Sequence, residues 1–320
     1  MKKIIACASA CCIALLFSQP CFAQAWPSKP VRIVIPFASG GPTDIIARLV
    51  GQKLNEILGQ PMVVESRAGA GGNIGTASVA KSAPDGYTVL LTSSAYAVNV
   101  SLSADPGYNP DRDFLPAVVI CKQANLIFVH PSLPAKNLAE FIELAKRQPG
   151  KLTFGSGGAT TLVAAEQFAE KAGIKMTHVP YKSNPLALND LLGGQIDMLI
   201  TDTATGLPQI KAGKVRALGV TTRTRSSLTP DVPTLQEGGL KDYELTFWFA
   251  AYSPAGTPPA ITQKLNELFV KAAKMPASEA FHKSVGTEAI TTTPEGLVKF
   301  QVAEAQKWKQ MIKRAGIQPE

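Results

Sequence analysis

Residues 31–59 of this 320-residue chain read VRIVIPFASGGPTDIIARLVGQKLNEILG, and this segment indicates the fold more clearly than any other. Residues 31–35 have the composition of a buried strand, and a loop rich in glycine and hydroxyl groups, 36–44, follows them. From Ile45 onward apolar residues recur every three or four positions until Gly59, which predicts an amphipathic helix with a glycine C-cap. A strand followed directly by such a helix is typical of a mostly parallel α/β sheet.

The same alternation of strand and helix continues along the rest of the chain. The next predicted strands are 62–65, 88–91, 152–154, 176–179, 196–200 and 215–220, and the clearest later helices are 261–274 and 294–314. The apolar segment 115–129 is long enough to pass from one sheet system to another, and residues 221–223 are the expected return path. The sequence therefore predicts two α/β lobes, joined by two crossings, with a cleft between them.

The first 25 residues have the pattern of a secretory signal peptide. Lys2-Lys3 precedes an apolar run, residues 4–17, and Ala23-Gln24-Ala25 supplies a small-residue site for cleavage before Trp26. Ala23 is also a candidate for the last residue removed. The apolar run is shorter than the roughly 18 residues that a membrane span needs, so a short membrane anchor is the weaker alternative. We expect a soluble protein exported to the periplasm.

The composition and motifs of the remaining chain exclude several classes of protein. Four of the five cysteines lie within the first 21 residues, which leaves Cys121 alone, with no disulfide framework and no zinc-type spacing. Beyond residue 25 there are 30 Lys and Arg against 24 Asp and Glu, and these charges are scattered, which argues against nucleic acid. The motifs GxSxG, HExxH and GxxxxGK[ST] do not occur. We therefore expect no catalytic residues, no cofactor and no metal.

Loops rich in glycine, serine and threonine follow five of the predicted strands. They are residues 36–44, 67–78, 92–95, 155–161 and 201–205. Ligands of open α/β sheets bind at the carboxyl ends of the strands, where these loops lie. A helix N-terminus presents unpaired N–H groups and a partial positive charge, and glycine lets a ligand approach the backbone. The loops therefore predict a site for a small anion; the alternative is that the glycines only form tight turns.

The candidate ligand-binding residues contribute backbone N–H groups, hydroxyls or a charge. Four of them keep an alternative: Asp44 is also a first-turn acid facing Arg48, and Asp202 is equally a helix cap. Lys182 is equally an ordinary exposed lysine, and Phe37 is also a candidate core residue. Lys182 is expected to reach a second anionic group of the ligand, with Arg67 as the alternative cation. The full predicted set is Phe37, Ser39, Gly40, Gly41, Thr43, Asp44, Ser93, Ser94, Gly155, Ser156, Gly157, Gly158, Thr160, Thr161, Lys182 and Asp202.

An ordered series of motifs gives the chain a family resemblance. They read PFASGGPTDIIAR, ESRAGAGGNIGTASVAKSAPDGYTVLLTSS, LTFGSGGATT, VPYKSNPLALNDLLGGQIDMLITD, IKAGKVRALGVTT and VPTLQEGGL. With these motifs the sequence closely resembles the receptors of tripartite tricarboxylate transporters, the Bug-type (TctC-like) periplasmic solute-binding proteins. The resemblance covers essentially the whole chain after the signal peptide.

The resemblance implies a type II periplasmic-binding-protein fold, in which two lobes joined by two strands close on an organic anion. It implies that backbone amides and ordered water hold one carboxylate, from loops 37–44 and 155–161, with Ser93, Ser94 and Asp202 nearby. The expected lobes are 26–124 together with 224–320, and 125–223. The expected partners are a small organic carboxylate and a membrane permease of the tripartite tricarboxylate type, and the protein is expected to be a monomer.

Two other functions remain open from the sequence. An exported hydrolase of a small carboxylated substrate would use Ser93 or Ser156 with His178. A ligand-sensing adaptor would use the same clamp to signal to a protein partner. The ligand itself, its affinity, the cognate permease and any role of Cys121 are not encoded in a motif.

Overall fold

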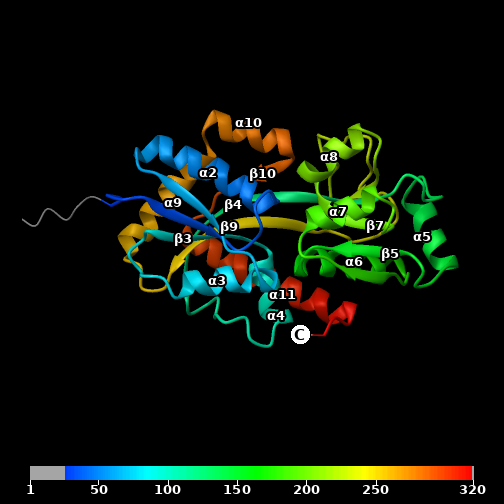
Figure 1. Cartoon of the computed structure of the whole chain (residues 1–320), viewed down its shortest axis with the longest axis horizontal. Helices are drawn as coiled ribbons and strands as arrows, with labels where there is room; N and C mark the ends of the chain where they lie inside the picture. Colours follow the sequence, from blue (N-terminus) through cyan, green and yellow to red (C-terminus); the bar gives the residue numbers. More distant parts are fainter. Residues whose placement is uncertain (1–25, 319–320) are drawn as a thin grey trace, which may run out of the picture.

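The computed structural model describes residues 26–318. The predicted signal peptide, both candidate cleavage sites and four of the cysteines lie outside these residues. Among the described residues, no helix is both long enough and apolar enough to cross a membrane. Figure 1 shows an elongated molecule in which two groups of helices are joined by long strands through the middle.

The N-terminal half of the described chain alternates strands and helices as expected. Its elements are β1 (Val31–Ile35), α2 (Pro42–Leu58), β2 (Met62–Ser66), the 3-10 helix η1 (Ala70–Gly72), α3 (Asn73–Ala80), β3 (Thr88–Ser93), α4 (Ala95–Leu102), β4 (Phe114–Val129) and α5 (Leu138–Arg147). The α2 helix begins with Pro42 after the N-cap Gly41 and ends at Gly59, whose φ of +64° is left-handed. These boundaries match the predicted start and stop signals.

The rest of the chain continues the alternation and ends in helices. Its elements are β5 (Thr153–Ser156), α6 (Ala159–Ala172), β6 (Thr177–Pro180), α7 (Asn184–Leu192), β7 (Met198–Asp202), α8 (Thr203–Lys211), β8 (Arg216–Val220), β9 (Thr246–Pro254), α9 (Pro259–Ala273), α10 (Pro276–Val285), β10 (Thr287–Ala289) and α11 (Pro294–Ala315). Each predicted strand is present, within two residues of its predicted limits at either end.

The strands form a ten-stranded sheet, in which eight strands follow the order β2-β1-β3-β9-β4-β7-β5-β6 and the other two, β8 and β10, pair with β4. β1 is parallel to β2 and β3, and β5 is parallel to β6 and β7, so each end of the sheet is a parallel α/β unit. The 16-residue β4 pairs with β9 along its first part and with β7 and β8 along its second part. This arrangement confirms the predicted α/β fold and the predicted crossing at 115–129.

The return crossing is β9 (Thr246–Pro254), so the expectation of a return at 221–223 is wrong. Thr221 stays beside the second part of β4, where its backbone N–H donates to Asn125 O at 2.9 Å. The segment after it carries buried apolar residues that pack on the helices of that end: Tyr243 Oη donates to Ala164 O at 3.2 Å, and Gly238 lies against Leu138. Because burial of these side chains stabilises the fold, the chain packs this segment on the second end of the sheet before it crosses back in β9.

The predicted lobe boundaries at 124/125 and 223/224 stay predictions. The contacts of residues 224–245 with α5 and α6 favour a second boundary near residue 245. The C-terminal helix α11 packs against both α4 and α6. One buried apolar cluster accordingly includes Phe168 of α6 together with Met311 and Ile312 of α11.

Candidate functional site

The loop after β1 is closed by the side chain of Asp44. Its Oδ2 atom accepts hydrogen bonds from the Gly40 backbone N–H at 3.0 Å and from Arg48 Nε at 2.9 Å. Burial of this carboxyl opposes its ionisation, but the bonds from Arg48 and Gly40 outweigh that effect and lower its pKa. Gly40 has a φ of +83°, a backbone conformation that favours glycine. Asp44 is therefore the first-turn acid of α2, paired with Arg48.

The start of α2 lacks a side-chain cap within the described chain. Its N-cap is Gly41, and no side chain from residues 26–318 caps its first turn. Thr43 is buried in that first turn, whereas Ser39 is exposed and pairs with Ser66 through their hydroxyls at 2.8 Å. The half-buried Phe37 lies in the same loop and packs beside Gly72 of η1. This loop therefore leaves backbone donors available, as an anion site requires.

The loop after β5 uses its glycines in different ways. Gly157 N–H donates to Asn184 Oδ1 at 2.9 Å, and a Cβ at Gly157 would collide with the backbone of Asn184. A Cβ at Gly155 would lie 2.6 Å from Ile196 Cδ1, so this glycine serves packing. Gly158 is different: it has extended backbone, and a Cβ there would meet nothing within 4 Å. Of the three, Gly158 alone combines open space with a place at a helix start.

The N-terminus of α6 resembles that of α2. Gly158 is its N-cap, and none of the described side chains caps its first turn. Thr161 is buried and donates its hydroxyl to Gly158 O at 2.9 Å, and Thr160 is partly exposed beside it. The α6 start thus presents backbone N–H groups and a hydroxyl, in the same way as the α2 start.

Ser156 and His178 are brought together across β5 and β6. The Ser156 Oγ atom lies 2.7 Å from His178 Nε2, and the His178 ring stacks on Phe154 with the ring centroids 5.0 Å apart. Ser156 is almost fully buried, with 4% of its surface exposed. This is the pair that the hydrolase alternative requires. The geometry also fits a serine hydroxyl that is held in place beside the α6 start.

The loop after β3 contributes one buried serine. Ser94 is fully buried, its backbone N–H donates to Trp248 O at 2.9 Å, and its Oγ atom has no partner among the described residues. Ser93 Oγ accepts from Ala95 N at 3.3 Å. A buried hydroxyl without a partner calls for an explanation such as a water molecule or a ligand.

The loop after β7 is a capped helix start. Asp202 is 2% exposed, its Oδ1 accepts from Thr205 N at 2.8 Å, and its Oδ2 accepts from the Thr205 and Thr201 hydroxyls at 2.7 and 3.2 Å. Burial raises the pKa of this carboxyl, although these bonds act against the rise. Of the two alternatives, the structure therefore contains the helix cap for α8.

Contacts with the crossing strands bring loops from both ends of the sheet close together. Ser94 bonds Trp248 on β9, which pairs with Lys122 on β4. Thr203 bonds Ala124 O, two residues along β4, through its hydroxyl at 3.5 Å. At about 3.3 Å per residue, the two anchoring points on β4 are about 7 Å apart. In addition, α4, which starts after Ser94, packs against α6.

Three residues near these loops were missed from the sequence. Asn125 on β4 is fully buried, and neither its Oδ1 nor its Nδ2 has a partner among the described residues; Gln123 Oε1 is in the same state. Asn184 holds the β5 loop through Gly157. The sequence held a signal for Asn125 and Gln123, because residues 122–125 are the polar interruption of the apolar segment 115–129. Lys182, in contrast, is exposed on the segment between β6 and α7.

The fold and these loops are those of a binding protein built from two α/β lobes. Known structures agree. The chain superimposes on R. palustris Rpa4515 with adipate with a TM-score of 0.89 and 34% identity, over 92% of this chain and all of that one. The periplasmic binding protein BugD superimposes with a TM-score of 0.87 and 33% identity, over 92% of this chain and all of BugD. MatC (Rpa3494) from Rhodopseudomonas palustris with bound malate superimposes with a TM-score of 0.84 and 29% identity, over 90% of this chain and all of MatC.

Residues 46–317 match the model of the tripartite tricarboxylate transporter family receptor, TctC. The chain belongs to this family, and the resemblance seen in the sequence is confirmed. The family consists of receptors that bind solutes, so the protein is not an enzyme and the Ser156–His178 pair is not the centre of a hydrolase. Periplasmic binding proteins share this fold.

Proposed function

We propose that this protein captures a small organic carboxylate between its two lobes and delivers it to a membrane permease of the tripartite tricarboxylate type. The observation that carries the proposal is the pair of glycine-capped helix starts, at Gly41 and Gly158, which no side chain of residues 26–318 caps. A carboxylate oxygen is the acceptor that such N–H groups lack. Adipate and malate, which accompany two of the related structures, belong to the same chemical class.

In this proposal the loops 37–44 and 155–161 hold one carboxylate of the ligand. Backbone N–H groups at the two helix starts, at Gly41 and Gly158, are the donors, whereas the Gly40 N–H and the Thr161 hydroxyl already donate to Asp44 and to Gly158 O and shape the two loops. Ser94 Oγ, which is buried without a partner among the described residues, binds the ligand or a water molecule beside it. Lys182 reaches a second anionic group when the ligand has one.

The proposed clamp works by closure of two lobes around the ligand. The lobes are 26–124 with the C-terminal region, and 125 to the loop that precedes β9, with β4 and β9 as the hinge strands. A ligand that contacts both lobes binds the closed form more tightly and shifts the open–closed equilibrium toward it. We further propose that residues 1–25 are a signal peptide removed near Ala25 or Ala23, and that the mature protein is a periplasmic monomer.

A panel of carboxylates tests the proposal on purified protein that has been unfolded and refolded to remove carried-over ligand. Dicarboxylates, tricarboxylates, aromatic acids and amino acids are added one by one, and the melting temperature is measured. A ligand at 100 times its dissociation constant adds about 2.7 kcal/mol to the free energy of unfolding, which corresponds to several degrees. A flat response across the panel contradicts the proposal. A ligand that binds while no permease is encoded or captured favours the adaptor alternative.

A further inference from the structure

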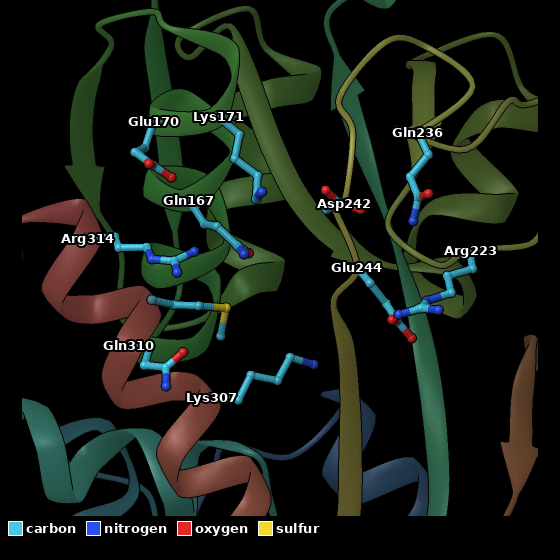
Figure 2. A pocket seen from close by; sticks show the side chains of 11 residues that line it. Gln167, Glu170, Lys171, Arg223, Gln236, Asp242, Glu244, Lys307, Gln310 and Arg314 are labelled. Atoms are coloured by element: carbon cyan, nitrogen blue, oxygen red, sulfur yellow. The ribbon is translucent and has the colours of Figure 1, made fainter.

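A cavity lies outside the loops described above. It has a volume of about 350 Å³ and lies between the C-terminal half of α6, the C-terminal half of α11 and the segment that leads into β9 (Figure 2). None of the residues predicted to bind the carboxylate lines it. A volume of this size is at the lower end of the range for small-molecule sites.

One side of this cavity is mainly basic. Lys171 of α6 and Lys307 and Arg314 of α11 line it from two different helices (Figure 2). Among residues 26–318, Lys171 and Arg314 take part in no ion pair, whereas Lys307 lies 3.7 Å from Glu304. Glu170 is the one acid on this side, so the three bases leave an excess of positive charge. Positive charges with few partners on one wall of a cavity are suited to an anionic group.

The opposite side carries acceptors. Asp242 and Glu244 lie across the cavity from the lysines, and Gln167 extends toward the middle from α6 (Figure 2). Glu244 is paired with Arg223, whereas Asp242 makes no hydrogen bond or ion pair within the described part of the chain. The Oε1 atom of Gln167 is buried and also lacks a partner there. A buried acceptor and a free carboxylate that line the same cavity are suited to an ammonium group.

The backbone at Asp242 supports a binding role. Its φ is +57°, one of only two positive values at non-glycine residues among residues 26–318. Aspartate tolerates this left-handed conformation better than most residues, yet the conformation still carries a cost. It places the Asp242 side chain at the edge of the cavity, next to the buried Tyr243 that fixes the segment to α6.

From these observations we propose that the cavity binds a small zwitterion, a molecule that carries a carboxylate and an ammonium group a few bonds apart. Lys171, Lys307 and Arg314 bind the carboxylate, and Asp242 with Gln167 Oε1 binds the ammonium group. A simple anion is repelled by the acids of one wall, and a simple cation is repelled by the bases of the other wall. Only a ligand with both charges satisfies both walls.

The test uses linear amino acids of increasing length: glycine, 4-aminobutyrate and 6-aminohexanoate. Binding to the mature protein is measured by titration calorimetry, with butyrate and butylammonium as single-charge controls. We expect at least one of the three to bind, and each single-charge control to bind at least about fivefold more weakly. The double variant Lys171→Gln/Arg314→Gln and the variant Asp242→Asn are each expected to weaken binding about tenfold, which is about 1.4 kcal/mol.

Two further variants separate this cavity from the carboxylate loops. Lys175→Gln removes an exposed positive charge four residues from Lys171 that does not line the cavity, and it should leave binding unchanged. Gly158→Val, which acts on the α6 start, should also leave it unchanged. The proposal is overturned if none of the three amino acids binds at about 10 mM, a concentration that detects even weak complexes. It is equally overturned if butyrate binds as well as they do, or if Gly158→Val alone abolishes the binding.

Discussion

The loop after β5 and the loop after β7 look alike in the sequence but differ in the structure. Both follow a buried strand at the same end of the sheet, and both lead directly into a helix. The loop after β5 starts α6 with Gly158, which offers no side chain to the first N–H groups. The loop after β7 starts α8 with Asp202, whose carboxylate already accepts from Thr205 N. One helix start is open to an anion, and the other is filled by its own anion.

The identity of the N-cap residue accounts for this difference. A side-chain cap and a bound anion compete for the same backbone donors, so a capped helix start offers fewer of them to a ligand. Elsewhere in the described chain, Asn137 caps α5 and Thr293 caps α11, and neither residue was predicted to bind ligand. In these two loops the N-cap residue distinguishes an uncapped helix start from a capped one, which the number of glycines does not.

The largest expected effect comes from filling the open helix start. Gly158→Val should lower the affinity for the carboxylate at least about a hundredfold, because its side chain occupies the space through which the ligand reaches the backbone. The fold should survive, since Gly158 has extended backbone and a Cβ placed there would meet no atom within 4 Å. Titration calorimetry with the ligand found by the panel measures the first effect, and thermal unfolding measures the second.

Gly158→Ala is the matched control, with a smaller loss of affinity and the same stability. Gly40→Val is a poorer test, because a φ of +83° strains any side chain and would confuse folding with binding. Unchanged affinity in a folded Gly158→Val protein would show that the ligand does not approach the α6 start.

A change at the filled helix start should affect stability instead of binding. Asp202→Ala removes the cap of α8 and should cost about 1–2 kcal/mol of unfolding free energy, with the affinity changed by less than about twofold. Asp202→Asn keeps an acceptor for Thr205 N and should restore most of the loss. Denaturant unfolding and ligand titration of the two variants measure these effects. A stable Asp202→Asn protein that no longer binds would instead place the Asp202 charge in the ligand site.

The smallest effect is a difference in pH dependence between Asp44 and Asp202. The lowered pKa of Asp44 contributes stability above about pH 4, the value for an unfolded aspartate, and this contribution is lost as the pH falls through the lower folded pKa. The raised pKa of Asp202 has the opposite sign: the folded state holds the proton longer, so stability falls as the pH rises from about 4 through the raised folded pKa.

Two amide variants measure these opposite slopes by unfolding at a series of pH values. Asp44→Asn should be less stable than the parent by about 1 kcal/mol at about pH 7, and the deficit should shrink in acid. Asp202→Asn should gain relative to the parent as the pH rises from about 4 to about 7. Parallel curves for the two variants would refute the assignment of opposite shifts.

Local sequence signals predicted most of the fold and part of the site. The α2 helix, with Pro42 at its start and Gly59 at its end, and every predicted strand were found because periodicity and caps are local properties. The return crossing was placed too early, since the apolar residues around Tyr243 gain their burial from helices that are distant in the sequence, such as α5 and α6. Asp202 stayed undecided between two roles, because a carboxylate that ends a strand suits a cap and a ligand equally well.

Side-chain periodicity and short ordered motifs were enough to establish the alternation of strands and helices, the glycine loops at the strand ends and the membership in a receptor family. None of these properties needs a distant partner. Packing, in contrast, determines where neighbouring atoms occupy the space beside a glycine, as at Gly155, and where that space is free, as at Gly158. Packing also brings Lys171 and Asp242 to one cavity. Free space and converging charges depend on elements far apart in the chain, and only the packed core fixes where those elements lie relative to one another.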